Sequence, residues 1–436
     1  MIRAVFASIT AAIVALPAWA IDIQEVTSPG GINAWLVEEH EIPFVALEVR
    51  VRGGANLDLP GKRGATNFMV GLLEEGAGDL DARGFATALE DLATTFGYDT
   101  FDDEVSISAR FLTENRDEAV DLLKLSLTQP TFDEASVERV RAQILSGIRS
   151  DLRDPDRIAA RAFYAKAFDG HPYATAREGT EESVTGITRD DLVEAHARVF
   201  AQDRLVVSAV GDITAEELAT LLDRLFGDLP ETGSEMPGDA DYQLSGGLSV
   251  VDFETPQSVA VFGHEGLPRD HPDFFPAFVL NHILGGGGFG SRLTEEVRVK
   301  RGLTYGISTY LAPRDHGALF LGQVASANDR IAESLDVIRE EWLRAATEGV
   351  TQEELERAQT FLTGAYPLRF DGNARIAGIL VGMQLTGLST DYVNTRNDRV
   401  NAVTLDDIKR VAGTLLDPDA LHFVVVGQPA GLEASN

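Results

Sequence analysis

The sequence predicts an α+β fold made of two homologous halves. Segments that alternate apolar and polar residues, as strands do, are interleaved along the chain with segments of helical periodicity. Residues 187–212 align without gaps with residues 403–428, which indicates an internal duplication. The 436 residues exceed the about 100–200 that one domain usually contains, so more than one domain is expected.

The aligned segments share their local signals. Each has a threonine that precedes a helix starting with two aspartates, which suits an N-cap and the positive end of the helix dipole. Each then has an Asp-containing turn and an apolar strand that ends at Gly211 or Gly427. Shared α–β patterning without common ancestry is the alternative explanation.

A polar linker is predicted between the halves. Residues 231–247, ETGSEMPGDADYQLSGG, contain glycine and proline between two patterned regions. We therefore expect one domain at 21–230 and a second at 248–436. The predicted strands are 43–53, 104–112, 257–264, 303–311 and 317–325, and the predicted helices are 64–74, 82–96, 115–128, 133–152, 272–284, 291–300, 328–347 and 351–365.

The first 20 residues have the pattern of a signal peptide. A charge at Arg3 precedes an apolar run, and the segment ends in Ala18-Trp19-Ala20, an A-x-A cleavage site. An uncleaved anchor helix is the alternative, but Pro17 and the shortness of the run argue against it, since a span needs about 20 apolar residues. We expect export to the periplasm and no membrane span after cleavage.

The bulk composition excludes several classes of function. A net charge of −32 repels nucleic acid and anionic membranes, so no nucleic-acid partner is expected. An acidic surface could also attract basic peptides, although a generally solvated surface is the simpler explanation. The absence of cysteine excludes disulfides, thiol catalysis and thiolate metal sites.

A glycine-rich stretch, GGGGFG, matches the dinucleotide fingerprint G-x-G-x-x-G at Gly285, Gly287 and Gly290. That fingerprint requires a preceding strand, whereas residues 271–284 have helical spacing, and Gly285 occupies the position expected of a helix C-cap. The sequence also lacks the G-K-[ST] of a P-loop. Nucleotide binding is therefore not predicted.

Arg298 and Tyr305 lie at the junction that follows the glycines. Arg298 is late on a predicted short helix, and Tyr305 is near the start of a predicted strand. A guanidinium and a phenol at such a junction could both donate hydrogen bonds to one peptide carbonyl. The alternative is structural: Arg298 pairs with Glu295 at i,i+3 spacing, and Tyr305 belongs to the core.

These residues resemble a known family, the pitrilysin/insulinase-type zinc peptidases with an inverted H-x-x-E-H motif. The branch with mitochondrial processing peptidase and its two-chain bacterial relatives is the most similar. The resemblance covers essentially the whole chain after residue 20. It rests on LGGGGFGSRLTEEVRVKRGLTYGIS (284–308), FDGHPYATAREGT (168–180) and VVSAVGDIT (206–214).

The resemblance implies two α+β halves, each a mostly antiparallel sheet packed with helices, that face each other as a clam-shell around a chamber. It implies a zinc site in the N-terminal half of active members. In the C-terminal half it implies that Arg298 and Tyr305 bind the substrate backbone. The glycines of the loop would allow close approach and mobility near an extended peptide; they are Gly285, Gly286, Gly287 and Gly288.

The zinc motif itself is missing. In GATNFMVGLLEEG the two histidine positions are Asn67 and Gly71, and the general-base position is Val70. The third ligand, a glutamate in active members, is replaced by Gly147. Asparagine is a poor zinc ligand, and valine and glycine offer no donor atom. No cofactor is expected in this chain, and zinc is expected in a partner.

No other catalytic pattern replaces this motif. The eight histidines include no i,i+4 pair, and His171 and His282 are interpreted as structural. The acidic clusters at 102–104 and 154–156 lack calcium-loop spacing and are expected to be solvated loops and helix starts. No nucleophile motif occurs.

The leading hypothesis is the non-catalytic, substrate-binding subunit of a heteromeric zinc metallopeptidase, inactive alone. A homologous partner with intact H-x-x-E-H would supply the zinc, and peptides would be the substrates. The second hypothesis is a pseudopeptidase with a scaffold or assembly role. The third is an independent hydrolase with an unrecognised site.

Overall fold

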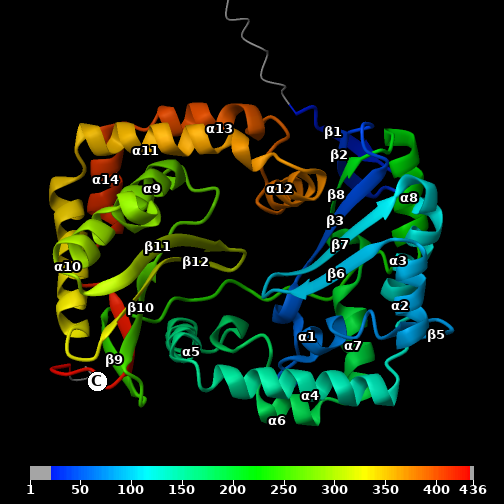
Figure 1. Ribbon diagram of the computed structural model, residues 1–436, viewed down its shortest axis with the longest axis horizontal. Coiled ribbons are helices and arrows are strands. Elements are labelled where there is room, and N and C mark those ends of the chain that lie inside the picture. The colour runs from blue at the N-terminus through cyan, green and yellow to red at the C-terminus, as the bar shows by residue number, and fades with distance from the viewer. Residues whose placement is uncertain (1–20, 433–436) are drawn as a thin grey trace, which may run out of the picture.

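The computed structural model describes residues 21–432, and the predicted signal peptide at 1–20 lies outside this range. Figure 1 shows two sheets that face one another across the middle of the molecule, each with helices on its outer side. The predicted fold class, two α+β halves arranged as a clam-shell, is confirmed. In the described range no helix is both long and apolar enough to cross a membrane.

The first half contains a six-stranded sheet with the order β1-β2-β8-β3-β7-β6. Only β2 and β8 pair in parallel, and every other neighbouring pair is antiparallel. The strands are β1 (Gln24–Thr27), β2 (Asn33–Glu38), β3 (Phe44–Arg52), β6 (Thr95–Thr100), β7 (Glu104–Leu112) and β8 (Leu205–Gly211). A short separate hairpin joins β4 (Gly76–Ala77) and β5 (Leu80–Asp81).

The second half repeats this topology in a five-stranded sheet, β11-β12-β10-β13-β9. Here too one outer pair, β13 and β9, is parallel and the others are antiparallel. The strands are β9 (Gly247–Asp252), β10 (Gln257–Glu265), β11 (Thr304–Arg314), β12 (Gly317–Ala327) and β13 (His422–Gly427). Apart from β1, the two sheets match strand for strand, which supports the duplication inferred from the sequence.

The helices also correspond between the halves. Thr188 and Thr404 each cap a helix through a capping box, as their shared sequence pattern predicts. The helices of the first half are α1 (Ala65–Val70), α2 (Ala82–Asp91), α3 (Arg116–Thr128), α4 (Glu134–Asp151), α5 (Pro155–Ala167), α6 (Glu181–Gly186), α7 (Arg189–Val199) and α8 (Ala215–Phe226). Those of the second half are α9 (Phe274–Asn281), α10 (Ile331–Glu348), α11 (Gln352–Ala365), α12 (Asn373–Leu385), α13 (Tyr392–Asn401) and α14 (Leu405–Leu415).

Strand alternation gives each sheet two apolar faces. On β8, Val207 and Ala209 belong to the main core of the first half, whereas Val210 belongs to a second cluster with α12. On β13, Phe423 lies in the core formed with α10 and α14, whereas Val424 packs in a cluster with α5. Each sheet is therefore covered by helices on both faces.

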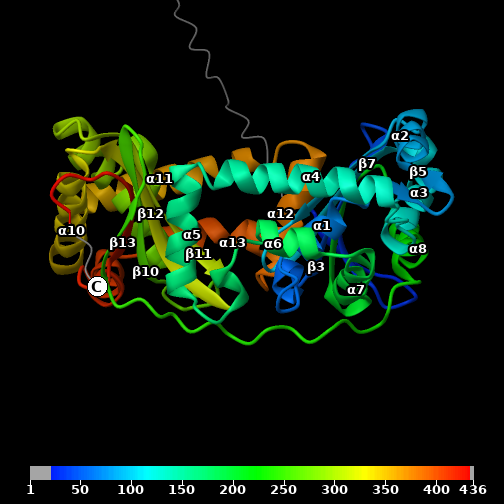
Figure 2. The same cartoon turned by 90° about the horizontal axis from the view of Figure 1, so that it is seen from below.

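The helix that covers each inner face comes from the other half. α12 packs on β3 and β8, and the buried Ser208 hydroxyl donates to the carbonyl of Ala377 at 2.7 Å. α5 packs on β10 and β13, with Phe163 fully buried in that cluster. The two halves thus exchange one helix each, as Figures 1 and 2 both show.

The segment between α8 and β9 has no regular secondary structure up to residue 246. It runs along one side of the molecule from the first half to the second (Figure 2).

The hairpin tips of the two sheets also meet. Arg314 of the β11–β12 hairpin pairs with Asp102 at 2.7 Å and stacks on Tyr164 and Tyr173 at 4.6 and 4.8 Å from their ring centres. Tyr173 donates to Asp103 at 2.6 Å, and burial raises the pKa of that carboxyl. The expectation of a solvated acidic cluster at 102–104 was therefore wrong, because these carboxylates join the two halves.

Two local predictions need correction. The helix predicted at 82–96 ends at Asp91, because Ala93 has a positive φ of 49° and β6 begins at Thr95. The helix predicted at 64–74 has regular geometry only from Ala65 to Val70 and continues as turns. Several elements were not predicted: helices α5, α6, α8, α12 and α13 and strands β1, β2, β4, β5, β6 and β9.

We predict that Arg314→Ala lowers the free energy of unfolding by about 2 kcal/mol, since it removes a partly buried ion pair and two cation–π contacts between the halves. Urea unfolding followed by circular dichroism measures this change. Arg83→Ala, which removes an exposed arginine of α2 without an ion pair among the described residues, is the matched control. Equal midpoints for the two variants would contradict the role of Arg314.

Candidate functional site

The positions of the missing zinc motif lie on two neighbouring helices. Asn67 and Val70 are on α1, Gly71 ends that helix, and Gly147 is on α4. A side chain added at Gly71 would meet Val140 of α4 at 3.4 Å, so the two helices are in contact at this point. The fold therefore retains the helix pair on which the resemblance places a metal site.

The residues at these positions do not fit zinc. Asn67 offers one neutral amide, Val70 is a buried apolar side chain, and Gly71 and Gly147 have no side chain. Within residues 21–432 no group of three histidine, aspartate or glutamate side chains is arranged to hold a metal ion. The chemistry of this donor set thus provides no water-activating centre.

The histidines interpreted as structural have structural contacts. The imidazole of His171 accepts from the Tyr173 amide at 3.2 Å and lies 3.1 Å from the carbonyl of Gly238. His282 stacks on Phe361 with ring centres 5.1 Å apart, and burial lowers its pKa.

The glycine stretch links two π-helical turns. Helix α9 continues as a π-helical turn at residues 282–286, and a second π-helix covers 294–300. π-Helical turns are rare and are frequent at functional sites. The helix before the glycines confirms that the dinucleotide fingerprint is an accidental match, because the required strand is absent from this described segment.

Three glycines of this stretch lie too close to neighbouring atoms to carry a side chain. A side chain at Gly285 would lie 2.4 Å from the Thr309 hydroxyl of β11, and one at Gly286 would lie 2.6 Å from the Asn281 amide. One at Gly287 would lie 2.6 Å from the carbonyl of His282. Three of the glycines therefore allow the turn to pack on its own neighbours.

The expected C-cap at Gly285 is not observed, because Gly285 continues the helix in its π-helical form. The left-handed position falls at Gly288, with φ of 57° and open space around its missing side chain. Gly288 therefore makes the turn that leads into Ser291 and the second π-helix.

Arg298 lies on the second π-helix and stacks on Phe289, with the guanidinium carbon 4.6 Å from the ring centre. Phe289 is 79% exposed and belongs to the glycine turn. Among the described residues Arg298 has no carboxylate partner, so the alternative of a pair with Glu295 is wrong. Its charge is free to meet a ligand.

Tyr305 is 86% exposed, so the alternative that it belongs to the core is also wrong. It lies in a β-bulge of β11, between the paired residues Thr304 and Ile307. β11 is an edge of the second sheet, where a bulge re-aims side chains. Both Arg298 and Tyr305 thus present polar groups at the start of this edge strand, although no direct contact joins them.

A partly buried ion pair that sequence patterns did not reveal anchors the glycine segment. Arg292 donates to both carboxylate oxygens of Glu354 on α11 at 2.6 and 2.7 Å and to the carbonyl of Gly349 at 3.1 Å. Burial alone would raise the pKa of Glu354, but the bonds from Arg292 and Thr351 hold it at about 2. The partners are 62 positions apart in the sequence, which explains why local spacing gave no signal.

Together the fold and these positions define a class of protein: a two-half peptidase-like chain without metal ligands. Comparison with known proteins supports this class. Residues 34–181 match the family described as Insulinase (Peptidase family M16), and residues 186–362 match the Peptidase M16 inactive domain.

Similar proteins span most of the chain. A non-peptidase homolog named YmxG from Helicobacter pylori is 28% identical, covering 89% of this chain and 90% of its own. A probable mitochondrial-processing peptidase subunit beta from Schizosaccharomyces pombe is 25% identical, covering 88% and 86%. The crystal structure of a peptidase M16 inactive domain from Pseudomonas fluorescens has a TM-score of 0.88 at 26% identity and covers 95% of this chain and 100% of its own.

The chain belongs to the M16, or insulinase, family of peptidases and is a non-catalytic member of it.

We predict that Glu354→Gln lowers the free energy of unfolding by about 3 kcal/mol at neutral pH, because it leaves Arg292 buried without its partner. The folded-state pKa is about 2, below the ordinary 4.5, so the stabilisation is present above pH 4.5 and is lost as the pH falls towards 2. The gap between wild type and variant in urea unfolding should therefore narrow over this window.

Glu353→Gln is the matched control, since this neighbouring carboxylate is exposed. A constant gap for Glu354→Gln across the acid range would contradict the assignment of the low pKa to this pair.

Proposed function

We propose that this chain is the substrate-binding, non-catalytic subunit of a heteromeric zinc metallopeptidase. A homologous partner with an intact H-x-x-E-H motif supplies the zinc. The observation that carries the proposal is the contrast between the two halves: the metal positions have lost their donors, whereas Arg298 is half-buried without a carboxylate partner in the described range and Tyr305 is exposed. The predicted signal peptide extends the proposal to an exported, periplasmic complex.

The chemistry of the pair suits a peptide backbone. A guanidinium and a phenol can both donate to the carbonyl beside the scissile bond, which positions it and stabilises the negative charge that develops on its oxygen. Arg298 is stacked on Phe289 rather than neutralised by a carboxylate, which favours this role. β11 is an edge strand, and such an edge can accept an extended peptide.

The similar proteins support a partnership. One relative is named as the beta subunit of a mitochondrial processing peptidase, and the term subunit implies an assembly for that protein. Another is named a non-peptidase homolog. A chain of this family without ligands for zinc, but with an unpaired arginine and an exposed tyrosine beside the glycine turn, is consistent with a subunit that binds substrate for another chain.

Reconstitution tests the proposal. We predict no peptidase activity for the chain alone, with or without added zinc, and chelator-sensitive activity after mixing with the H-x-x-E-H homologue of the same organism. A fluorogenic peptide library measures both. Activity of the isolated chain would contradict a non-catalytic role, and a homologue equally active without this chain would favour the scaffold alternative.

In the reconstituted complex, Arg298→Ala should lower kcat/KM by about 100-fold, as expected for the loss of one donor to the transition state. Tyr305→Phe should lower it about tenfold, because only the hydroxyl is lost. Size-exclusion chromatography should show the complex intact. The control is Arg83→Ala on the outer helix α2, and rates that match this control would remove both residues from the mechanism.

A further inference from the structure

A cavity separate from the glycine turn lies in the second half, beside the helix α12 that this half contributes to the first sheet. It has a volume of about 680 Å³, within the range of ligand sites. Its walls come from α9, β11, α12 and α13 and from the segments before α9, after α11 and after α12. All of these elements belong to the second half, and one of them, α12, is the helix that packs on the first sheet. We call it the arginine pocket.

The pocket is positively charged in a strongly acidic chain. Four arginines line it: Arg269, Arg369, Arg375 and Arg396. No aspartate or glutamate lines it in the described range, although the chain carries 69 acidic residues against 37 basic ones. Within that range none of the four forms an ion pair.

Two of these arginines are held inside the wall by neutral groups. Arg396 is 6% exposed and donates to the carbonyl of Leu362 at 2.7 Å and to the side chain of Asn397 at 3.0 Å. Arg269 donates to the hydroxyl of Tyr392 at 3.0 Å. Burial lowers the pKa of Arg396, and the nearby charge of Arg369 lowers it further, so the charges repel without an anion between them.

Aromatic side chains form much of the remaining wall. Six rings line the pocket: Phe274, Phe275, Phe278, Tyr310, Tyr366 and Tyr392. Arg269 stacks on Phe274 at 4.2 Å, and Arg396 stacks on Tyr366 at 4.5 Å. The Tyr366 hydroxyl is buried and has no hydrogen-bond partner in the described structure. Guanidinium groups fixed on rings are preorganised donors for carboxylates.

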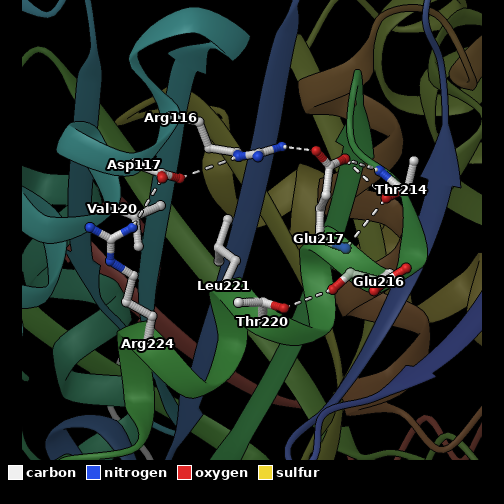
Figure 3. A pocket seen from close by; sticks show the side chains of 9 residues that line it. All are labelled: Arg116, Asp117, Val120, Thr214, Glu216, Glu217, Thr220, Leu221 and Arg224. Atoms are coloured by element: carbon white, nitrogen blue, oxygen red, sulfur yellow. Dashed lines mark hydrogen bonds and ion pairs between the residues drawn. The ribbon is translucent and has the colours of Figure 1, made fainter.

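A second hollow, on the surface of the first half, differs from the arginine pocket in how its arginines are paired. Figure 3 shows the pocket between α3 and α8, where Arg116 pairs with Glu217 at 3.1 Å and Arg224 with Asp117 at 3.4 Å. Each positive charge there is neutralised within the chain. The arginine pocket is also lined by arginines, but none of them pairs with a carboxylate of the described chain. An anion that neutralises them must therefore come from a ligand.

We propose that the arginine pocket binds an acidic peptide segment in which aspartate or glutamate flanks a large apolar residue. The exposed Arg369 and Arg375 and the deeper Arg269 and Arg396 take the carboxylates, and the aromatic wall takes the apolar side chain. Four guanidinium groups from four different segments suit more than one carboxylate. That the ligand is a peptide rests on the proposed function. The inference adds the class of peptide that the proposed subunit would bind.

The overall charge of −32 does not prevent this binding. Exposed charges are screened beyond about 8 Å at physiological ionic strength, so the groups in contact with the ligand decide its affinity. The pocket would therefore select acidic segments locally, although the outer surface slows their approach.

The test uses the full mature chain and blocked peptides, whose ends are acetylated and amidated so that only side chains carry charge. We predict that Ac-Gly-Glu-Phe-Glu-Gly-NH2 binds with a dissociation constant of roughly 10–100 μM in calorimetry at low salt. The matched Gln-Phe-Gln peptide and the Glu-Gly-Glu peptide should each bind at least fivefold more weakly. Raising the salt should weaken only the acidic peptides.

The exposed arginines provide variants that should fold normally. Arg369→Gln and Arg375→Gln should each weaken binding about threefold, and the double variant about tenfold. Arg83→Gln makes the same charge change on the outer helix α2 and should leave binding unchanged. Equal binding of the glutamine peptide, unchanged affinity in the double variant, or binding only of peptides with a free C-terminal carboxylate would each overturn the proposal.

Failure of this test and failure of the proposed function can be told apart. Peptide binding is measured on the chain alone, whereas the proposed function is measured on the reconstituted complex. Binding without activation of the partner would retain the pocket and remove the subunit role. Activation without binding, and with the double variant fully active on acidic peptides, would remove the pocket alone.

Discussion

The structure depends on one packing constraint: the inner face of each sheet is covered by a helix of the other half. Without α12, Ala46 and Val210 of the first sheet would face water, and without α5 the same holds for Val424 and Val426 of the second. Since exposing this apolar surface is costly, the two halves cannot separate as rigid bodies with their own helices. Because α12 forms part of the wall of the arginine pocket, the exchange also holds that wall in place.

The duplication explains why the zinc-motif positions of the first half and the glycine turn of the second half occupy equivalent places. α1, with Asn67 and Gly71, follows the central strand β3, and α9 with its glycine turn follows the equivalent strand β10. The same place in the repeat thus carries a lost metal site in one half and a glycine turn with Arg298 in the other. Helices α1 and α4 pack against each other although they carry no metal-ligating side chains at the motif positions. The packing of this helix pair therefore does not depend on the residues that would bind a metal.

Local patterns predicted much of this fold but could not predict its long-range pairings. The capping boxes at Thr188 and Thr404 and most strands were legible because their signals lie within a few residues. α12 was missed because it is apolar on most sides, as a helix buried between layers is, and lacks a polar stripe. The exchange, the pair of Arg292 with Glu354 and the contact of Asp102 with Arg314 join distant segments, and periodicity carries no information about such partners.

The exposure of an arginine without an ion pair determines how much free energy its lack of a partner costs. An unpaired arginine on the surface remains hydrated, so it costs little free energy. Arg396 is buried and Arg269 half-buried, so both lose hydration, and neutral carbonyls, hydroxyls and ring faces replace only part of it. A chain with 69 acidic residues could readily have placed one of them here. Among the described residues no aspartate or glutamate lines the pocket. A carboxylate that enters it therefore gains the electrostatic attraction that the arginines lack without a ligand, and this attraction is the physical basis for selecting an acidic ligand.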